Sequence, residues 1–355
     1  ILSHLPVFHS SYFLLSIIPK SLMQANLFFQ IPSLPIHLLT KFEDFHKIKY
    51  PYLFLFPMEV VFVNSLSPNT CFGVVGGDLR QAALAKKLSE QGFCVKAFFL
   101  EHFPQFLSPE LCCDDLTKLS ECDVVILPLP VSINEAFLNA PLSDQSVSLS
   151  VVLSFCKKDA LIFGGKVSSG DLQKAEQLGL SISDYLKREE MAVLNAVPTA
   201  EGAVALALSE RASTLWESNC LITGFGRCAK TLALLLKGFG VHVTIAARKE
   251  GDLAFARTLG LSSCHLSELP VVLPKQEILF NTIPHIIFDR DLLSMVPEDC
   301  LMIDLASRPG GIDFETASEL GRKTIWALSL PGKVAPITAG NIICQTVINM
   351  IRSIA

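Results

Sequence analysis

Short apolar runs alternate with longer stretches of helical spacing along most of the chain. The first run, Cys71–Val75, leads into a glycine turn and then into apolar residues at helical spacing over Leu79–Gln91. Later apolar runs at Phe93–Leu100, Asp123–Pro128 and Ala160–Phe163 are also expected to be strands. Because these runs are apolar on both faces, they are typical of strands covered by helices on each side of a parallel sheet.

The same alternation starts again in the second half. A helix-compatible stretch, Thr199–Ser213, follows Pro198 and precedes a second series of strands. We expect these strands at Cys220–Thr223, Val241–Ala246, Glu277–Asn281, Leu301–Asp304 and Thr324–Ala327. Helical spacing returns at Thr338–Ile351. The pattern predicts an α/β protein with two Rossmann-like, doubly wound parallel-sheet domains and a cofactor cleft between them.

The predicted boundaries follow from where the alternation starts and stops. We expect one domain over residues 58–197, a second over 198–335, and a C-terminal helix over 336–355 that packs back on the first domain. Residues 1–57 are rich in Phe, Leu, Ser, Pro and His without periodicity. We interpret them as a non-domain or upstream segment, with translation starting near Met58.

Composition removes several classes of partner. The 355 residues carry a formal net charge of −5, and the Lys and Arg residues are scattered, so no nucleic-acid partner is expected. No stretch reaches the roughly 20 uninterrupted apolar residues of a membrane span, so no membrane partner is expected. The eleven cysteines include no CxxC and several lie in apolar runs, as Cys71, Cys122 and Cys300 do, which indicates buried thiols in a reducing compartment. The eight histidines show no metal-ligand spacing, so we expect no metal site.

One glycine turn has the context of a dinucleotide site. The string Gly224–Ala229 is G-x-G-x-x-A, directly after an apolar strand and directly before a helical run. The first glycine permits a tight turn, the second allows close approach of a pyrophosphate, and the helix N–H groups face the anion. The residues expected to hold the cofactor here are Gly224, Phe225, Gly226, Arg227 and Cys228. The alternative is a tight turn that binds nothing.

The end of the next strand favours NADP over NAD. NAD enzymes place Asp or Glu there for the ribose hydroxyls, whereas this chain has Arg248 and Lys249 after two alanines. The planar guanidinium of Arg248 suits a 2′-phosphate, and Lys249 adds positive charge. We therefore predict an NADP-binding domain at 198–335. The alternative for Arg248 is that it is a solvated residue at the end of a strand and binds no cofactor.

Further candidates lie at other strand ends, where doubly wound sheets bind their ligands. Arg308 is predicted to bind a substrate carboxylate, and the alternative is an ion pair that holds its loop. Lys166 is predicted to be a second catalytic cation, and the alternative is a solvated surface lysine. In the substrate domain, 58–197, the turn Gly76–Asp78 is expected to face the substrate, with Arg80 or the helix N-terminus meeting an anion. A second dinucleotide site is the alternative there. The remaining candidate substrate residues are Thr199 and Glu201, for which helix capping is the alternative. The remaining candidate cofactor residues are Asn281, Thr282, Ile283, Pro284, Ala306 and Ser307.

Several motifs in register give the chain a family resemblance from about residue 70 to the C-terminus. They are Val75–Gln81, Asn195–Gly202, Thr223–Arg227, Asn281–Pro284, Asp304–Gly311, Leu330–Gly332 and Ala335–Gly340. Together they resemble the family of dipicolinate synthase A subunits, which is related to the D-isomer-specific 2-hydroxyacid dehydrogenases.

The resemblance implies a function during sporulation in the cytoplasm of the mother cell. It implies NADP-dependent oxidation of a dihydrodipicolinate-type intermediate to pyridine-2,6-dicarboxylate, with the flavoprotein-like B subunit of dipicolinate synthase as partner. A small dicarboxylate would be the substrate, and we also expect the chain to form a homo-oligomer. The dehydrogenases carry a general-base His in the stretch that corresponds to Leu330–Pro336, but this chain has none there, and Lys333 is a weak substitute.

Two other functions stay open at this point. One is another NADP-dependent dehydrogenase of the 2-hydroxyacid type, which the missing His argues against. The other is a non-catalytic NADP-binding subunit that senses redox state or delivers substrate to its partner, since a cofactor site without an identifiable base is compatible with that role.

Overall fold

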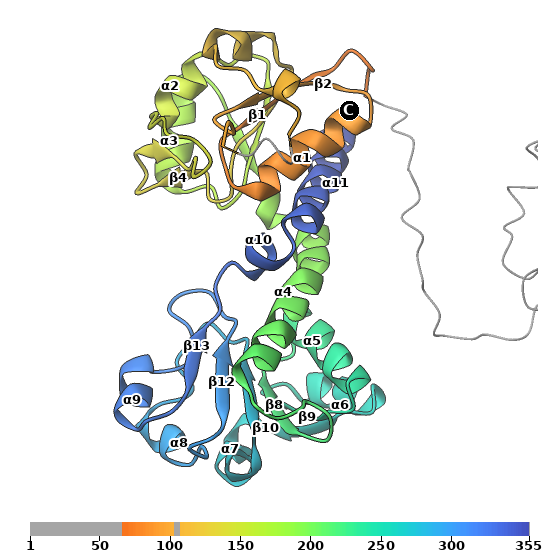
Figure 1. The fold of residues 1–355 in the computed structure, drawn as a ribbon, viewed down its shortest axis with the longest axis vertical. Helices are drawn as coiled ribbons and strands as arrows, with labels where there is room; N and C mark the ends of the chain where they lie inside the picture. Colours follow the sequence, from red (N-terminus) through yellow and green to blue (C-terminus); the bar gives the residue numbers. More distant parts are fainter. Residues whose placement is uncertain (1–65, 103–106, 355) are drawn as a thin grey trace, which may run out of the picture. The chain divides into compact units, whose positions relative to one another are not determined.

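The fold is seen in a computed structural model, which describes residues 66–102 and 107–354. These residues belong to one compact unit, Val63–Ala355. The predicted upstream segment 1–57 lies outside the described residues. Two parallel sheets, each flanked by helices, make up the described part (Figure 1).

The first sheet has five parallel strands in the order β2-β1-β3-β6-β7. The strands are β1 (Cys71–Val75), β2 (Cys94–Phe98), β3 (Val124–Ile126), β6 (Leu161–Gly164) and β7 (Ile182–Asp184). The order corresponds to 2-1-3-4-5, a doubly wound arrangement whose order reverses beside the first strand. Strand β7 was not predicted, because a three-residue edge strand that ends on Ser183 and Asp184 has no apolar run.

The second sheet has six parallel strands in the order β10-β9-β8-β11-β12-β13, the 3-2-1-4-5-6 order of the Rossmann fold. The strands are β8 (Asn219–Thr223), β9 (His242–Ala247), β10 (Ser262–His265), β11 (Ile278–Asn281), β12 (Leu301–Asp304) and β13 (Thr324–Trp326). The predicted fold class is confirmed. Strand β10 was missed because it lies at the edge of the sheet and is not apolar.

Helices and short connecting elements complete the two layers around each sheet. Beside the first sheet lie α1 (Leu79–Glu90), α2 (Leu149–Ser154), α3 (Ser169–Gln177) and a small hairpin of β4 (Ser132–Ile133) and β5 (Phe137–Leu138). Beside the second lie α5 (Arg227–Gly238), α6 (Glu250–Thr258), α7 (Leu269–Val272), α8 (Arg290–Ser294) and α9 (Phe314–Glu319). Short 3-10 helices cover Pro109–Leu111, Leu116–Glu121, Tyr185–Lys187, Leu266–Glu268 and Leu273–Lys275.

Helix α4 (Glu189–Glu210) corrects the predicted start of a helix at Thr199. It begins ten residues earlier and contains Pro198, so it runs across the predicted boundary at 197/198. Most residues of α4 before Pro198 have high helix propensity, and the helix continues through the proline. In the described part of the chain, α4 alone is long and apolar enough to cross a membrane. Packing explains this composition, because Ala203 and Ala207 are fully buried in the core around the second sheet.

The C-terminal residues form α10 (Leu330–Val334) and α11 (Pro336–Ile354). Helix α11 lies along α1 (Figure 1). Its Ile343 and Val347 join the core of the first sheet. Close approach of the two helices requires Gly340, since a Cβ there would lie 2.8 Å from the Cβ of Ala83.

Candidate functional site

The Gly224–Gly226 turn lies at the carboxyl edge of the second sheet, between β8 and α5. Gly224 has φ +90°, and a Cβ there would lie 3.0 Å from Cγ1 of Ile283, so only glycine fits. At Gly226, by contrast, a Cβ would meet no atom within 4 Å. Gly226 precedes α5, whose first N–H groups have no side-chain cap. The turn therefore offers open space and unpaired donors to an anion such as a pyrophosphate.

The other predicted residues of this turn have different surroundings. Phe225 is buried, packs edge-on against Phe255, and lies under the ammonium of Lys230 at 5.2 Å from its ring centroid. Arg227 is exposed and its Nη1 is 2.6 Å from Oε2 of Glu189 at the start of α4. Burial raises the pKa of Cys228 above its ordinary value, so this thiol is protonated at neutral pH. A phosphate would thus meet the backbone of this turn rather than its side chains.

The two basic residues after β9 are exposed and available. Neither the Arg248 nor the Lys249 side chain forms a hydrogen bond or an ion pair with any other described residue. The strand lies next to the glycine turn, because Gly224 N donates to Ala246 O at 2.9 Å. A guanidinium at this place fits the 2′-phosphate of NADP, and β9 ends on Ala247 without a carboxylate for ribose hydroxyls.

A buried polar network joins the ends of three adjacent strands in the second sheet. The hydroxyl of Thr223 on β8 donates to Oδ1 of Asn281 on β11 at 2.7 Å, and Nδ2 of Asn281 donates to Oδ1 of Asp304 on β12 at 2.8 Å. All three side chains are fully buried. Since buried polar groups that are mutually satisfied are held rigidly, the network fixes the carboxyl edge of the sheet.

Two of the predicted cofactor residues after β11 are hydrogen-bonded to residues of this network. Ile283 N donates to Oδ1 of Asn281 at 3.2 Å, and Nδ2 of Asn281 donates to Ile283 O at 2.9 Å. The hydroxyl of Thr282 donates to Thr223 O at 2.7 Å. Thr282 and Ile283 are half-buried, whereas Pro284 is exposed. This segment is therefore held beside the glycine turn.

Asp304 organises the loop that carries Arg308. Its carboxylate accepts hydrogen bonds from Ala306 N at 2.9 Å and from Gly311 N at 2.6 Å. The two ends of the loop are thereby held together. Ser307 and Arg308 are exposed at its tip. The guanidinium of Arg308 lies 5.6 Å from the ring centroid of Trp326, a cation–π contact that leaves its N–H groups free for a carboxylate.

At the carboxyl edge of the first sheet, Arg80 is already engaged. Its Nη2 donates to Oδ2 of Asp78 and to Leu129 O, both at 2.8 Å, and its side chain is only 11% exposed. Gly332 of α10 lies against it, since a Cβ there would be 3.1 Å from Nε. Arg80 thus holds the turn before α1, and only its remaining N–H groups are open to an anion.

Lys166, which follows β6 at the same edge, differs from Arg80. Its side chain is exposed and its φ of +53° lies in the left-handed region, which is uncommon for a lysine. The carboxylate of Asp184 accepts from Lys166 N at 3.2 Å and from Val167 N at 3.2 Å, and so maintains this backbone. Strained backbone of this kind is often found at ligand sites.

Thr199 and Glu201 lie within α4 rather than at its start, so the capping alternative is wrong for both. The hydroxyl of Thr199 donates to Asn195 O of the same helix at 2.7 Å, a bond inside a helical turn. Glu201 is exposed. Among the described residues neither is hydrogen-bonded to another predicted site residue, and their substrate role stays a prediction.

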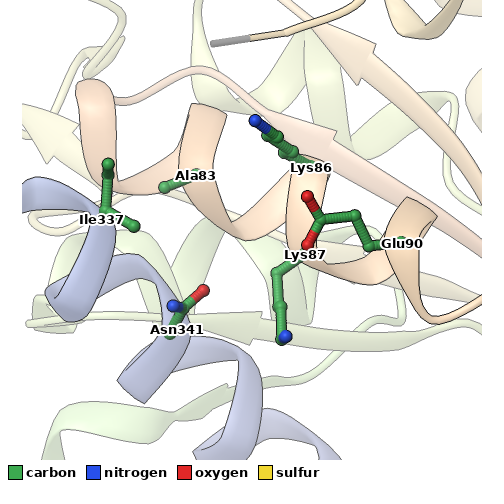
Figure 2. Close-up of a pocket in the computed structure, with 6 residues that line it drawn as sticks. All are labelled: Ala83, Lys86, Lys87, Glu90, Ile337 and Asn341. Atoms are coloured by element: carbon green, nitrogen blue, oxygen red, sulfur yellow. The ribbon is translucent and has the colours of Figure 1, made fainter.

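A pocket of about 130 Å³ lies outside this set of residues. Figure 2 shows its lining, which α1 and α11 supply: Ala83, Lys86, Lys87, Glu90, Ile337 and Asn341. None of them is a predicted site residue, so the pocket gives no support to the predicted cofactor cleft, which stays a prediction. Within 66–102 and 107–354, no group of three or more His, Cys, Asp and Glu side chains is placed to hold a metal ion.

No role was predicted from the sequence for Thr223, Asp304 or Trp326. The first two are polar residues that end apolar strands, and this shared position is the signal that could have identified them. Trp326 Nε1 donates to Ala306 O at 3.0 Å, so it supports the Arg308 loop from β13. That contact joins residues 20 positions apart and has no local sequence signal.

Comparisons of the sequence with known proteins point to one family. The family model for the N-terminal domain of the dipicolinate synthase A subunit matches residues 71–186. The A subunit of dipicolinate synthase from Bacillus subtilis (strain 168) is 32% identical over 287 residues, covering 79% of this chain and 95% of the relative.

Solved structures extend the match to three dimensions. The crystal structure of the dipicolinate synthase A chain from Bacillus subtilis has a TM-score of 0.73 at 29% identity, covering 81% of this chain and 97% of that one. The A subunit from Bacillus halodurans also has a TM-score of 0.73, at 25% identity, over 79% and 97% of the two chains. This chain therefore belongs to the family of dipicolinate synthase A subunits.

Proposed function

We propose that this chain is the A subunit of a dipicolinate synthase and oxidises a dihydrodipicolinate-type intermediate to dipicolinate with NADP. One observation supports the cofactor most directly: the open space over Gly226 lies at the carboxyl edge of a Rossmann sheet, next to a strand that ends beside the exposed Arg248. The names of the relatives support the product and a second, partner polypeptide, for which we propose the B subunit. We place the reaction in the cytoplasm of the mother cell during sporulation.

The residues fit a two-electron oxidation in which the substrate ring loses one hydride and one proton. When bound, NADP would supply the hydride acceptor at C4 of its nicotinamide. The N–H groups at the start of α5 would hold the pyrophosphate, and Arg248 the 2′-phosphate. Arg308 and Lys166 would oppose the two carboxylates of the substrate, so the chain orients the ring. No dedicated base is needed, because aromatisation favours loss of the ring proton.

The test is to follow the absorbance of dipicolinate when the full chain receives freshly generated dihydrodipicolinate and NADP, with and without a candidate B subunit. Product with this chain alone would make it the dehydrogenase. Product only with both chains would indicate a shared active site. No product in either case, together with saturable NADPH binding, would contradict the proposal and favour the non-catalytic role.

A parallel assay with simple 2-hydroxyacids addresses the other dehydrogenase function. We expect no NADP reduction with them, since the stretch Leu330–Pro336 has no His to accept the hydroxyl proton. Turnover of a hydroxyacid in the absence of dipicolinate formation would contradict the proposed substrate.

A further inference from the structure

Two cysteines face each other at the amino ends of β1 and β2, away from the candidate site. Cys71 and Cys94 are aligned partners in the parallel pairing of these strands, and their sulfur atoms are 2.9 Å apart. A third thiol, Cys122, has its sulfur 4.0 Å from that of Cys71. All eleven cysteines of the chain are free thiols.

The two partners differ in access to solvent. Cys71 is 7% exposed, whereas Cys94 is exposed. Burial, and then the contact with Cys94, raises the pKa of the Cys71 thiol far above its ordinary value, so Cys71 keeps its proton at neutral pH. Cys94 is therefore the sulfur that a soluble reagent meets first, and Cys71 is a thiol held in contact behind it.

We propose that Cys71 and Cys94 form a reversible intramolecular disulfide when the protein meets a peroxide. The sulfur of Cys94 attacks one peroxide oxygen, the O–O bond breaks, and Cys94 becomes a sulfenic acid as one water leaves. The sulfur of Cys71 then attacks the Cys94 sulfur, the S–O bond breaks, and the Cys71 proton leaves with the oxygen as a second water. Two thiols are oxidised by two electrons, and one peroxide is reduced to two waters.

The strand pairing favours this disulfide over one with Cys122. Aligned residues on neighbouring strands have Cα atoms within the range that a disulfide bridges, so the sulfurs need to move by only about 1 Å to reach the bond length of ~2.05 Å. Cys122 is fully buried, and burial raises its pKa to about 11, so a peroxide does not oxidise it first.

Peptide mapping of the full chain tests the proposal without any substitution. Trypsin cleaves after Arg80, Lys87, Lys96 and Lys118, so Cys71, Cys94 and Cys122 fall on three different peptides. After treatment with hydrogen peroxide and alkylation of free thiols, we expect a linked pair of the Cys71 and Cys94 peptides. Dithiothreitol should separate them. A Cys71–Cys122 link with Cys94 alkylated, or Cys94 converted to sulfinic acid with Cys71 alkylated, would overturn the proposal.

Two variants provide the matched controls. Cys94→Ser should abolish the linked pair, whereas Cys122→Ser should retain it at wild-type yield. Oxidation should also raise the midpoint of thermal unfolding of the wild type by roughly 5 °C, because the disulfide closes a loop in the unfolded chain. Loss of the linked pair in a folded Cys122→Ser protein would contradict the assignment.

Discussion

The carboxyl edges of the two sheets use their cations differently. At the first sheet, Arg80 is bound to Asp78 and to a backbone carbonyl and is almost completely buried. At the second sheet, Arg248 and Arg308 are exposed, and neither forms an ion pair with another described residue. The second edge thus leaves two guanidinium groups unpaired among the described residues, whereas the first edge uses one guanidinium to hold its own turn.

The difference has a physical cause in the interiors of the two edges. Thr223, Asn281 and Asp304 satisfy one another and hold the loops of the second edge from beneath. No guanidinium is needed for that task, so the arginines are free to bind anions. At the first edge the corresponding support comes from Arg80 itself.

Removal of the buried carboxylate of Asp304 should have the largest effect on stability. Asp304→Ala removes an acceptor of Asn281 and the acceptor of three backbone N–H groups in the core. We expect a loss of about 3–5 kcal/mol in the free energy of unfolding. Asp313→Ala, which removes the side-chain cap of α9, should cost much less. Urea unfolding measures both. Equal losses would mean that the network does not hold the second edge.

A charge at Gly226 should affect binding rather than folding. Gly226→Asp places a carboxylate where the pyrophosphate is proposed to lie, and NADPH affinity should fall about 100-fold, or ~2.7 kcal/mol. Stability should change by less than about 1 kcal/mol, since a Cβ there meets no atom within 4 Å. Gly238→Asp, at the other end of α5, is the control and should leave fluorescence titrations with NADPH unchanged. Undiminished binding by Gly226→Asp would contradict the proposed cofactor site.

Reversal of charge at Arg248 should change the choice of cofactor. Arg248→Asp removes the proposed partner of the 2′-phosphate and supplies an acceptor for ribose hydroxyls, so the preference for NADPH over NADH should fall about 30-fold. The measurement is the ratio of the two dissociation constants. Arg257→Asp, which reverses an exposed charge at the end of α6, is the matched control. An unchanged ratio for Arg248→Asp would refute the assignment of this strand end.

Substitutions of the two cations at the first edge, Arg80 and Lys166, should differ in their effect on stability. Arg80→Ala leaves Asp78 and Leu129 O without their partner and should cost about 2 kcal/mol in the free energy of unfolding. Lys166→Ala should change it by less than about 0.5 kcal/mol, because the lysine side chain is exposed. Thermal or urea unfolding distinguishes them. A larger loss from Lys166→Ala than from Arg80→Ala would mean that Lys166, not Arg80, holds the first edge.

Arg308 should affect the substrate but not the cofactor. Arg308→Ala removes the guanidinium proposed to grip a carboxylate, and the KM for the dihydrodipicolinate-type substrate should rise about tenfold, or ~1.4 kcal/mol. NADPH affinity should stay at the wild-type value, and Arg308→Lys should recover part of the loss as a point charge. Parallel loss of substrate and NADPH binding would assign Arg308 to the fold of its loop.

Much of the local architecture was predictable from hydrophobic pattern. Strands β1 and β12 have the predicted bounds, and the other strands with a continuous apolar run were found within a few residues. The edge strands β7 and β10 and the first half of α4 were missed. Short edge strands need no apolar run, and a proline in a long helix is tolerated when packing holds the helix together.

The fold class, the G-x-G turn and the absence of a carboxylate directly after β9 could be predicted from the chain alone, because each depends on residues close together in the sequence. Which cations are free of partners could not. The engagement of Arg80 with Leu129 O, the network of Thr223, Asn281 and Asp304, and the thiol pair of Cys71 and Cys94 all join residues brought together by strand order. Such contacts depend on how parallel strands line up across a sheet, and neighbouring residues along the chain carry no record of that alignment.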